Sequence, residues 1–228
     1  MKDLRWLWLG RVGYDEAHDL QLQVRDAVTR GQAPTTLILL EHDPIITLGR
    51  REENGDLLVQ RKDLAARGIQ VRRSERGGQA TYHGPGQLVG YLFARARDLA
   101  ADMPTLVGGI EDTMLGICSS LKVQARRNTE HRGVWVGAAK VGFVGLAVTH
   151  GVTWHGFALN VDPDLAPFEL IRPCGLDDQV TSITESGGER LAPSTVAELA
   201  AGELARAFSH QATRAISQNM RDLRRSLL

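Results

Sequence analysis

Residues 122–161, KVQARRNTEHRGVWVGAAKVGFVGLAVTHGVTWHGFALNV, are the stretch that decides the fold class of this chain. Short runs rich in Val, Leu, Phe and Trp follow one another here, separated by Gly and polar residues, and this pattern predicts consecutive strands. The expected strands cover residues 122–125, 133–136, 140–148 and 152–161. A strict βαβ order would place a helix between each pair of strands. Successive strands instead favour an α+β fold, in which helices pack on a mixed sheet.

Helical patterns and further strands lie on both sides of this stretch. Apolar residues recur at helical spacing from Tyr14 to a stop near Gly31. Residues 104–121 predict a long helix with Pro104 in its first turn, and its three glycines are expected to mark close packing. Other helices are expected at residues 56–67, from a Ser194 cap to about residue 210, and at the end of the chain. Other strands are expected at residues 4–9, 36–40, 45–48, 69–72 and 87–94.

The composition restricts the class of protein. The 228 residues are 43% hydrophobic and 24% charged, which is typical of a globular chain. We expect a single domain over residues 1–228. The 27 Lys and Arg balance the 27 Asp and Glu, and this neutrality argues against a nucleic-acid-binding or membrane-coating protein. No apolar run is long enough for a membrane span or a signal peptide, so a cytoplasmic location is expected.

A glycine-rich segment, RGGQATYHGPGQ at residues 76–87, is the first candidate for chemistry. Glycine lets backbone N–H groups approach a ligand because no Cβ stands in the way. The segment matches neither a P-loop nor the dinucleotide fingerprint, since the spacing of Gly84, Gly86 and Gly90 is wrong for the latter by one residue. Two interpretations remain open here: a ligand-binding loop, or two tight turns of a hairpin.

The segments 137–145, which contains Lys140, and 153–161 are the second and third candidates. A lysine at the start of an apolar strand extends to solvent in one interpretation, and is desolvated and acts on a neighbouring group in the other. Trp154 and Phe157 with small residues between and beside them predict one wall of an apolar slot, or ordinary sheet core. His155 is compatible with a structural, hydrogen-bonded histidine.

Cys174 is the fourth candidate, because its place between Pro173 and Gly175 indicates a turn and an accessible thiol. Cys118 lies in an apolar helix and is interpreted as a core residue. Two cysteines are too few for a disulfide framework. His83, His150, His155 and Cys174 lack the spacing of a zinc site, so neither a metal nor another cofactor is expected.

Together the four segments resemble the lipoyl(octanoyl) transferases of lipoate biosynthesis. The segment 76–87 looks like the signature loop of that family. Lys140 with Val144-Gly145, then His155-Gly156-Phe157-Ala158-Leu159-Asn160-Val161, then Pro173-Cys174-Gly175 match its remaining blocks in order, and Thr181-Ser182-Ile183 fits their continuation. The similarity runs from about residue 37 to residue 183. It departs from the family at Gly142-Phe143, where smaller residues are expected, so Phe143 is a place where the acyl slot is expected to differ.

The resemblance implies the fold of the biotin and lipoate protein ligases and an acyltransferase activity. An octanoyl or lipoyl group would pass from acyl carrier protein to a lysine of lipoyl domains, in 2-oxoacid dehydrogenase complexes and in the glycine cleavage H protein. Cys174 would accept the acyl group as a thioester and Lys140 would activate the thiol. The expected substrate-binding residues are Arg76, Gly77, Gly78, Gln79, Ala80, Thr81, Tyr82, His83, Phe143, Val144, Gly145, Gly156, Phe157 and Ala158. A monomer that binds neither nucleic acid nor membrane is expected.

These residue types suit that chemistry. Thioester exchange followed by amide formation is a natural sequence for a cysteine nucleophile. Two roles are open for Lys140: its ammonium would increase the thiolate fraction, or its neutral amine would accept a proton from the incoming amine. The segment 76–83 would offer backbone donors to the acyl carbonyl. The apolar slot is expected to involve Leu88, Phe143, Val144, Trp154 and Phe157. Five arginines are interpreted either as a docking patch for an acidic carrier or as a solvated face: Arg50, Arg51, Arg72, Arg73 and Arg76.

Three other functions are compatible with parts of this pattern. An ATP-dependent lipoate or biotin ligase on the same fold would form an acyl-adenylate and would need no nucleophilic cysteine. A non-catalytic module would bind lipoyl domains or acyl carriers without forming an acyl-enzyme. A thiol hydrolase would need a Cys–His–Asn arrangement, which cannot be read from the sequence.

Overall fold

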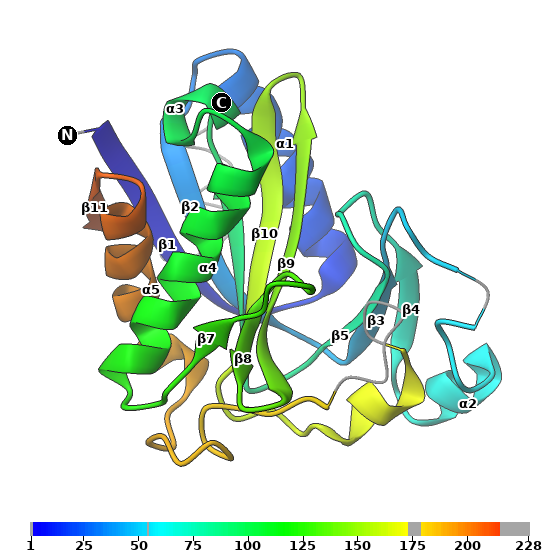
Figure 1. Ribbon diagram of the computed structural model, residues 1–228. Helices are drawn as coiled ribbons and strands as arrows, with labels where there is room; N and C mark the ends of the chain where they lie inside the picture. The colour runs from blue at the N-terminus through cyan, green and yellow to red at the C-terminus, as the bar shows by residue number, and fades with distance from the viewer. Residues whose placement is uncertain (1, 54, 173–178, 215–228) are drawn as a thin grey trace.

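The computed structural model describes residues 2–53, 55–172 and 179–214. In these ranges, eight strands form one sheet and three form a smaller sheet beside it (Figure 1). The larger sheet contains, in spatial order, β11 (His210–Arg214), β1 (Lys2–Val12), β2 (Thr35–His42), β6 (Gln87–Phe93), β10 (Val152–Asn160), β9 (Ala139–Thr149), β8 (Val134–Val136) and β7 (Arg126–Arg127). The smaller sheet contains β4 (Gln70–Arg73), β3 (Ile45–Leu48) and β5 (Ala80–His83).

Both sheets are mixed. In the larger one, β1 runs parallel to β2 and β11, whereas β2, β6, β10, β9, β8 and β7 are antiparallel from neighbour to neighbour. In the smaller one, β3 is parallel to β4 and antiparallel to β5. The prediction of an α+β fold with helices packed on a mixed sheet is therefore confirmed.

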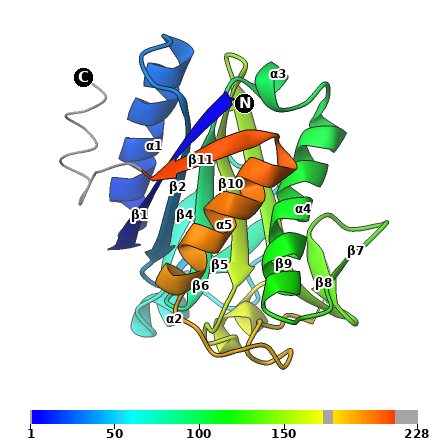
Figure 2. The same cartoon turned by 90° about the vertical axis from the view of Figure 1, so that its left-hand side faces the viewer.

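The two faces of the larger sheet are covered by different elements (Figures 1 and 2). Helices α4 (Met103–Ser120) and α5 (Pro193–Ala207) pack on one face, here called the helix face. Helix α1 (Tyr14–Thr29) and the smaller sheet share a hydrophobic core with the opposite side, here called the small-sheet face. The remaining helical segments are short: α2 (Arg61–Ala66), α3 (Ala96–Leu99) and η1 (Ala166–Leu170).

The long helices form where the sequence signals predict them. The apolar residues of α1 occur at three- and four-residue spacing, and Ala17, Leu20 and Val24 are buried against the small-sheet face. The side chain of Asp102 caps α4 by accepting a hydrogen bond from the backbone N–H of Thr105 at 2.8 Å. No described helix is long and apolar enough to cross a membrane.

Two of the three glycines in α4 allow α5 to approach closely, as expected. A Cβ at Gly109 would lie 2.5 Å from the ring of Phe208, and one at Gly116 would collide with the side chain of Glu203. A Cβ at Gly108 would lie 3.6 Å from the guanidinium of Arg127, which is an ordinary contact distance. The cost of glycine to the helix is therefore offset at Gly109 and Gly116 by contact between neighbouring elements.

Several predicted boundaries are wrong for reasons of tertiary contact. The helix expected at 56–67 spans only α2, because the backbone groups of Asp56 and Leu58 are bonded to Arg172 and Leu170. The strand expected at 122–125 is absent: Lys122 has a φ of 62°, and Val123 donates to the carbonyl of Cys118 at the end of α4. Ser194 is not the cap of α5, which begins at Pro193 after an Ala192 N-cap.

The C-terminal region also differs from expectation. Helix α5 ends at Ala207, and β11 follows it as an edge strand beside β1. The predicted terminal helix lies outside the described residues.

Candidate active site

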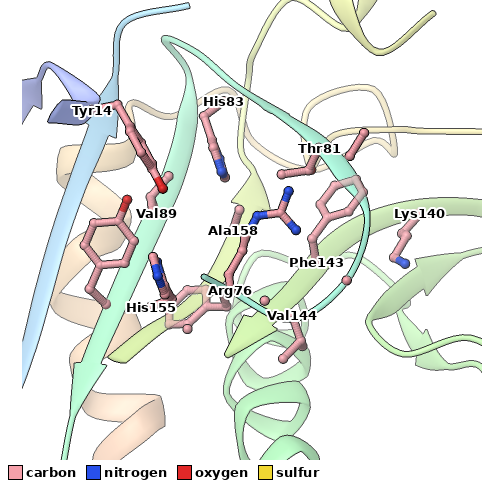
Figure 3. Close-up of a pocket in the computed structure, with 16 residues that line it drawn as sticks. Tyr14, Arg76, Thr81, His83, Val89, Lys140, Phe143, Val144, His155 and Ala158 are labelled. Carbon is pink, nitrogen blue, oxygen red and sulfur yellow. The ribbon is translucent and has the colours of Figure 1, made fainter. Parts of the chain in front are cut away.

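A pocket lies on the small-sheet face, between the two sheets (Figure 3). Its floor consists of small residues on the adjacent strands β9 and β10: Gly145, Gly156 and Ala158. Lys140 lies at one side and Tyr14 at the other, with Phe143 and Arg76 between them (Figure 3). The other lining residues are Gly78, Ala80, Thr81, His83, Val89, Tyr91, Val144, His155 and Phe157.

A β-bulge directs Lys140 into this pocket. Val134 of β8 pairs with Gly142, but the next residue, Trp135, pairs with Lys140, so Val141 is the extra residue on β9. Without the bulge, strand alternation would direct residues 140 and 143 to opposite faces of the sheet. With it, Val141 joins the core of the helix face, and Lys140 and Phe143 both line the pocket.

Lys140 is held from several sides. Its side chain is almost completely buried, with the residue only 2% exposed. The Nζ atom lies 5.2 Å from the ring centre of Trp135 and 5.3 Å from that of Phe143, both within cation–π range. Its backbone N–H donates to the carbonyl of Gln179, and its carbonyl accepts from Thr181. The interpretation in which this lysine extends to solvent is therefore wrong.

Arg76 is a second buried cation, so it does not lie on the surface as the docking-patch interpretation requires. Its guanidinium donates to the carbonyls of Thr47, Gln79 and Gly77 and to the hydroxyl of Thr47, at 2.6–3.0 Å. These bonds tie the segment 76–79 to strand β3. Arg76 is therefore part of the pocket wall and is wrongly included in a surface patch.

The exposed arginines of that predicted patch are partly paired. Arg72 makes a bidentate interaction with Asp15, with distances of 2.9 and 3.0 Å, and Arg73 pairs with Glu52. Arg50 and Arg51 are exposed. Pairing of Arg72 and Arg73 weakens the docking-patch interpretation, because neutralised charges attract an acidic partner less strongly.

Buried aromatic and imidazole rings cluster at and behind the pocket. Burial, together with nearby His42, lowers the pKa of His83 to about 3, and burial lowers the pKa of His42 to about 4. Burial and the positive charge of Arg76 hold the pKa of His155 well below 6.5. These rings are therefore neutral near pH 7, and Arg76 and Lys140 are the cationic side chains among the described lining residues.

A hydrogen-bond chain joins the glycine-rich segment to the backbone of Lys140. His83 Nδ1 lies 2.7 Å from the amide oxygen of Gln87, which requires the imidazole to donate. Gln87 donates to Asn160 at 2.9 Å, and Asn160 donates to the carbonyl of Thr181 at 3.0 Å. Since Thr181 donates to the carbonyl of Lys140, this chain fixes His83 and Lys140 in one network.

Most of the predicted substrate-binding residues meet at this pocket, including Arg76, His83 and Phe143. Three of them do not line it. Tyr82 packs edge-on against Phe168, and the carbonyls of Gly77 and Gln79 accept from Arg76. The N–H of Gly77 donates to Leu146, so it is not an available donor for an acyl carbonyl.

The predicted slot and hairpin also need correction. Leu88 lies in the core of the helix face, and the ring of Trp154 stacks on His155 outside the pocket lining. Strand β5 pairs with β3, whereas β6 pairs with β2 and β10, so the segment 76–87 crosses between two sheets and is not a hairpin.

Sequence reasoning missed Tyr14, Val89 and Tyr91 as lining residues. Tyr14 stands at the start of an amphipathic helix, and the other two lie in a strand whose residues are all buried. None of these patterns distinguishes a pocket residue from a core residue. His155, for which a structural role was one of two interpretations, lines the pocket in a left-handed conformation with φ of 54°, and its Nε2 atom has no hydrogen-bond partner among the described residues.

Cys174 lies outside the described residues. The described chain ends before it at Arg172, whose N–H donates to Asp56, and resumes at Gln179, which is bonded to Lys140. Cys118 is buried in the core of the helix face, where burial raises the pKa of its thiol to about 12. Among described residues, no three His, Cys, Asp or Glu side chains are arranged to hold a metal ion.

Comparison with known proteins gives the class of protein. Residues 13–205 match the model of the lipoyl protein ligase A/B catalytic domain. Among solved structures, the chain superposes on a bipartite lipoate protein ligase from Thermoplasma acidophilum with a TM-score of 0.74 and 18% identity, covering 100% of this chain and 92% of that one. A biotin protein ligase from Aquifex aeolicus gives 0.57 and 12%, covering 90% and 70%. These structures show the shared fold.

Curated relatives are more similar in sequence. An octanoyltransferase of Chloroflexus aurantiacus is 40% identical over 213 residues, covering 92% of this chain and 96% of the relative. One of Acidobacterium capsulatum is 38% identical over 224 residues, covering 91% of each. The chain belongs to the lipoyl protein ligase A/B catalytic domain family, among its octanoyltransferases. It is an acyltransferase of protein lipoylation, as the sequence resemblance implied.

Proposed function

We propose that the chain transfers an octanoyl group from an acyl carrier protein to a lysine of a lipoyl domain through a thioester on Cys174. Lys140 is the activating residue in this scheme. The observation that carries the proposal is the burial of its ammonium at one side of a pocket whose floor is made of small residues. A cation at the wall of a buried pocket acts more strongly on a group that enters the pocket than it would in water.

The pocket suits the acyl chain. Glycine and alanine on its floor leave room above the sheet, and Phe143, Val144 and Phe157 provide apolar contacts. Burial of each methylene of an octanoyl group favours binding by about 0.8 kcal/mol. The neutral histidines add no charge to this environment, so the acyl tail meets few groups that would need solvation.

Two exchange steps account for the reaction. The Cys174 sulfur attacks the carbonyl carbon of the carrier thioester, the carbon–sulfur bond to the carrier breaks, and the carrier leaves as a free thiol. The amine of the acceptor lysine then attacks the acyl-enzyme, an amide forms, and Cys174 is released as a thiol. The acyl group is already activated as a thioester, first on the carrier and then on Cys174, so neither step requires ATP.

Lys140 assists by its charge. A cation beside a thiol lowers the thiol pKa and raises the fraction of the reactive thiolate at neutral pH. Gln179, which is bonded to the backbone of Lys140, lies only five positions after Cys174 in the sequence. The thiol must also remain reduced, which fits a reaction in the cytoplasm.

An ATP-dependent ligase is the second candidate, supported by the shared fold. The relatives that are about 40% identical over most of the chain are octanoyltransferases, whereas the ligase structures are 12–18% identical. The higher identity favours the transferase.

Intact-protein mass spectrometry tests the proposal. Incubation with octanoyl-carrier alone is expected to add one octanoyl mass, located on Cys174, and Cys174→Ala is expected to abolish both the adduct and transfer. An adduct on Cys118, or transfer by Cys174→Ala at the unmodified rate, would contradict the thioester scheme. Octanoylation of a lipoyl domain from free octanoate that requires ATP would support the ligase instead.

A further inference from the structure

The segment 133–136, which consists of Gly133 and strand β8, packs against the side chain of Lys140. Gly133, with φ of 118°, lies so close that a Cβ there would be 2.7 Å from Cε of Lys140 and would also collide with the carbonyl of Gly142. Trp135, two residues later, pairs with Lys140 across the strands and places its ring near Nζ. The backbone at residue 133 and the ring at residue 135 therefore confine the methylene stem and the ammonium together.

Glu111 on helix α4 is hydrogen-bonded to the first residue of this segment, Gly133. The carboxylate is buried, with the residue only 1% exposed. Its Oε1 accepts a hydrogen bond from the N–H of Gly133 at 2.8 Å, the residue that lies against Lys140. Its Oε2 lies 3.2 Å from Arg127 and 3.9 Å from Arg132, two arginines that reach it from solvent.

A buried carboxylate in a core helix needs a reason, because desolvation of its charge is unfavourable. Glu111 does not line the acyl pocket, so a direct part in the chemistry is excluded by its position. Gly133, which donates its backbone N–H to Glu111, lies against the side chain of Lys140, and Lys140 does line the pocket. The arrangement connects α4, through Gly133, to the place where Lys140 holds its ammonium.

We propose that Glu111 is a positioning residue for Lys140, acting through its hydrogen bond to Gly133. This inference rests on the proposed activation of Cys174 by Lys140. The carboxylate fixes Gly133, and with it the start of strand β8, against β9, and this segment then keeps the lysine stem from leaving the pocket. When that hydrogen bond is removed, the N–H of Gly133 loses its buried acceptor, and the segment 133–136 is free to shift.

The test measures the alkylation rate of Cys174 by iodoacetamide against pH, with the modified peptide identified by mass. The unmodified enzyme is expected to show an inflection below the ordinary thiol pKa of about 8.5, and Lys140→Met to return it to that value. Glu111→Leu is expected to move the inflection in the same direction and to lower the rate at pH 7 several-fold. Glu111→Gln retains an oxygen acceptor for Gly133 and is expected to keep the unmodified profile.

Asp112→Asn is the matched control. Asp112 is the next residue on α4, bonds the same Arg127 at 2.8 Å, and has a side chain 56% exposed. Its loss is expected to leave the alkylation profile unchanged. A purely structural role for Glu111 would lower the melting temperature without moving the inflection of the folded protein, so both quantities are measured on every variant.

The outcomes separate the two proposals. An unchanged inflection in Lys140→Met would overturn the role of Lys140 itself. A shift in Lys140→Met without one in Glu111→Leu would overturn only the positioning role of Glu111. Should Glu111→Leu fail to fold, Glu111→Asp decides the matter: the side chain is one methylene shorter, so its carboxylate is drawn away from the N–H of Gly133, and an unmoved inflection would contradict the proposed route through Gly133.

Discussion

The two faces of the large sheet bury different kinds of residue. On the helix face, α4 and α5 cover a core that consists mainly of apolar side chains such as Leu92, Ile110 and Ile117, with the carboxylate of Glu111 also buried on α4. On the small-sheet face, apolar residues share the interior with Lys140, Arg76 and neutral histidines. One sheet thus supports an interior that serves stability and an interior that also holds the candidate chemistry. Variants on the two faces are expected to affect different quantities.

Lys140→Met is the largest expected difference on the small-sheet face. Methionine has a similar length and fits an apolar site, so the melting temperature is expected to stay the same or to rise. Loss of the ammonium is expected to lower octanoyl transfer by roughly tenfold, because a thiol whose pKa rises from about 7 to about 8.5 loses most of its thiolate at pH 7. Steady-state transfer to a lipoyl domain and thermal unfolding measure the two effects, and a large loss of stability with normal turnover would contradict this comparison.

Ile110→Ala is the counterpart on the helix face. Ile110 lies on α4 and is completely buried against the helix face, so truncation leaves a cavity. We expect the free energy of unfolding to fall by about 2–5 kcal/mol, while turnover per folded molecule stays within about twofold. Urea unfolding and an activity assay at a temperature where the variant remains folded provide the measurement. A tenfold loss of turnover would show that the helix face contributes directly to the site.

The buried histidines of the small-sheet face predict a smaller, pH-dependent effect. His42 and His83 have pKa values lowered to about 4 and about 3 from 6.5, so the unfolded chain binds protons that the folded chain does not. Their contribution is fully present above pH 6.5 and is lost as the pH falls towards the folded-state values. When the pH falls from 7.5 to 5, each of these two histidines is expected to lower the free energy of unfolding by about 2 kcal/mol.

Urea unfolding at several pH values measures this dependence. His42→Gln does not titrate in this range and is expected to flatten the slope. His150→Asn is the control, because His150 is exposed in the turn between β9 and β10 and adopts a φ of 51° that asparagine tolerates. Equal slopes for the unmodified protein and His42→Gln would contradict a neutral, buried His42.

Local sequence signals were sufficient for the elements that repeat a simple pattern. The spacing of apolar residues predicted α1, and Pro104 with the following apolar residues predicted α4. The runs at 140–148 and 152–161 predicted β9 and β10 to within about one residue. The helix at 56–67 and the Ser194 cap were wrong, because contacts with Leu170 and Arg172 and the entry at Ala192 decide those boundaries.

The candidate site was predicted in part. Arg76, His83 and Lys140 stood out through their types and their glycine or apolar neighbours, and Phe143 through its departure from the family pattern; all four line the pocket. Tyr14, Val89 and Tyr91 carried no such signal, since a buried aromatic or aliphatic residue has the same pattern in a core and in a pocket wall.

The sequence by itself determined which family this chain belongs to, and it marked the segments 76–87, 137–145, 153–161 and 171–175 as candidates for chemistry. It did so because glycine, lysine and histidine at fixed positions in apolar strands are local features. Only the tertiary structure decided that β5 and β6 lie in different sheets, that the bulge at Val141 turns Lys140 towards the pocket, and that Glu111 meets Gly133. These depend on pairing between residues far apart in the chain, and no local propensity specifies the register of such pairs.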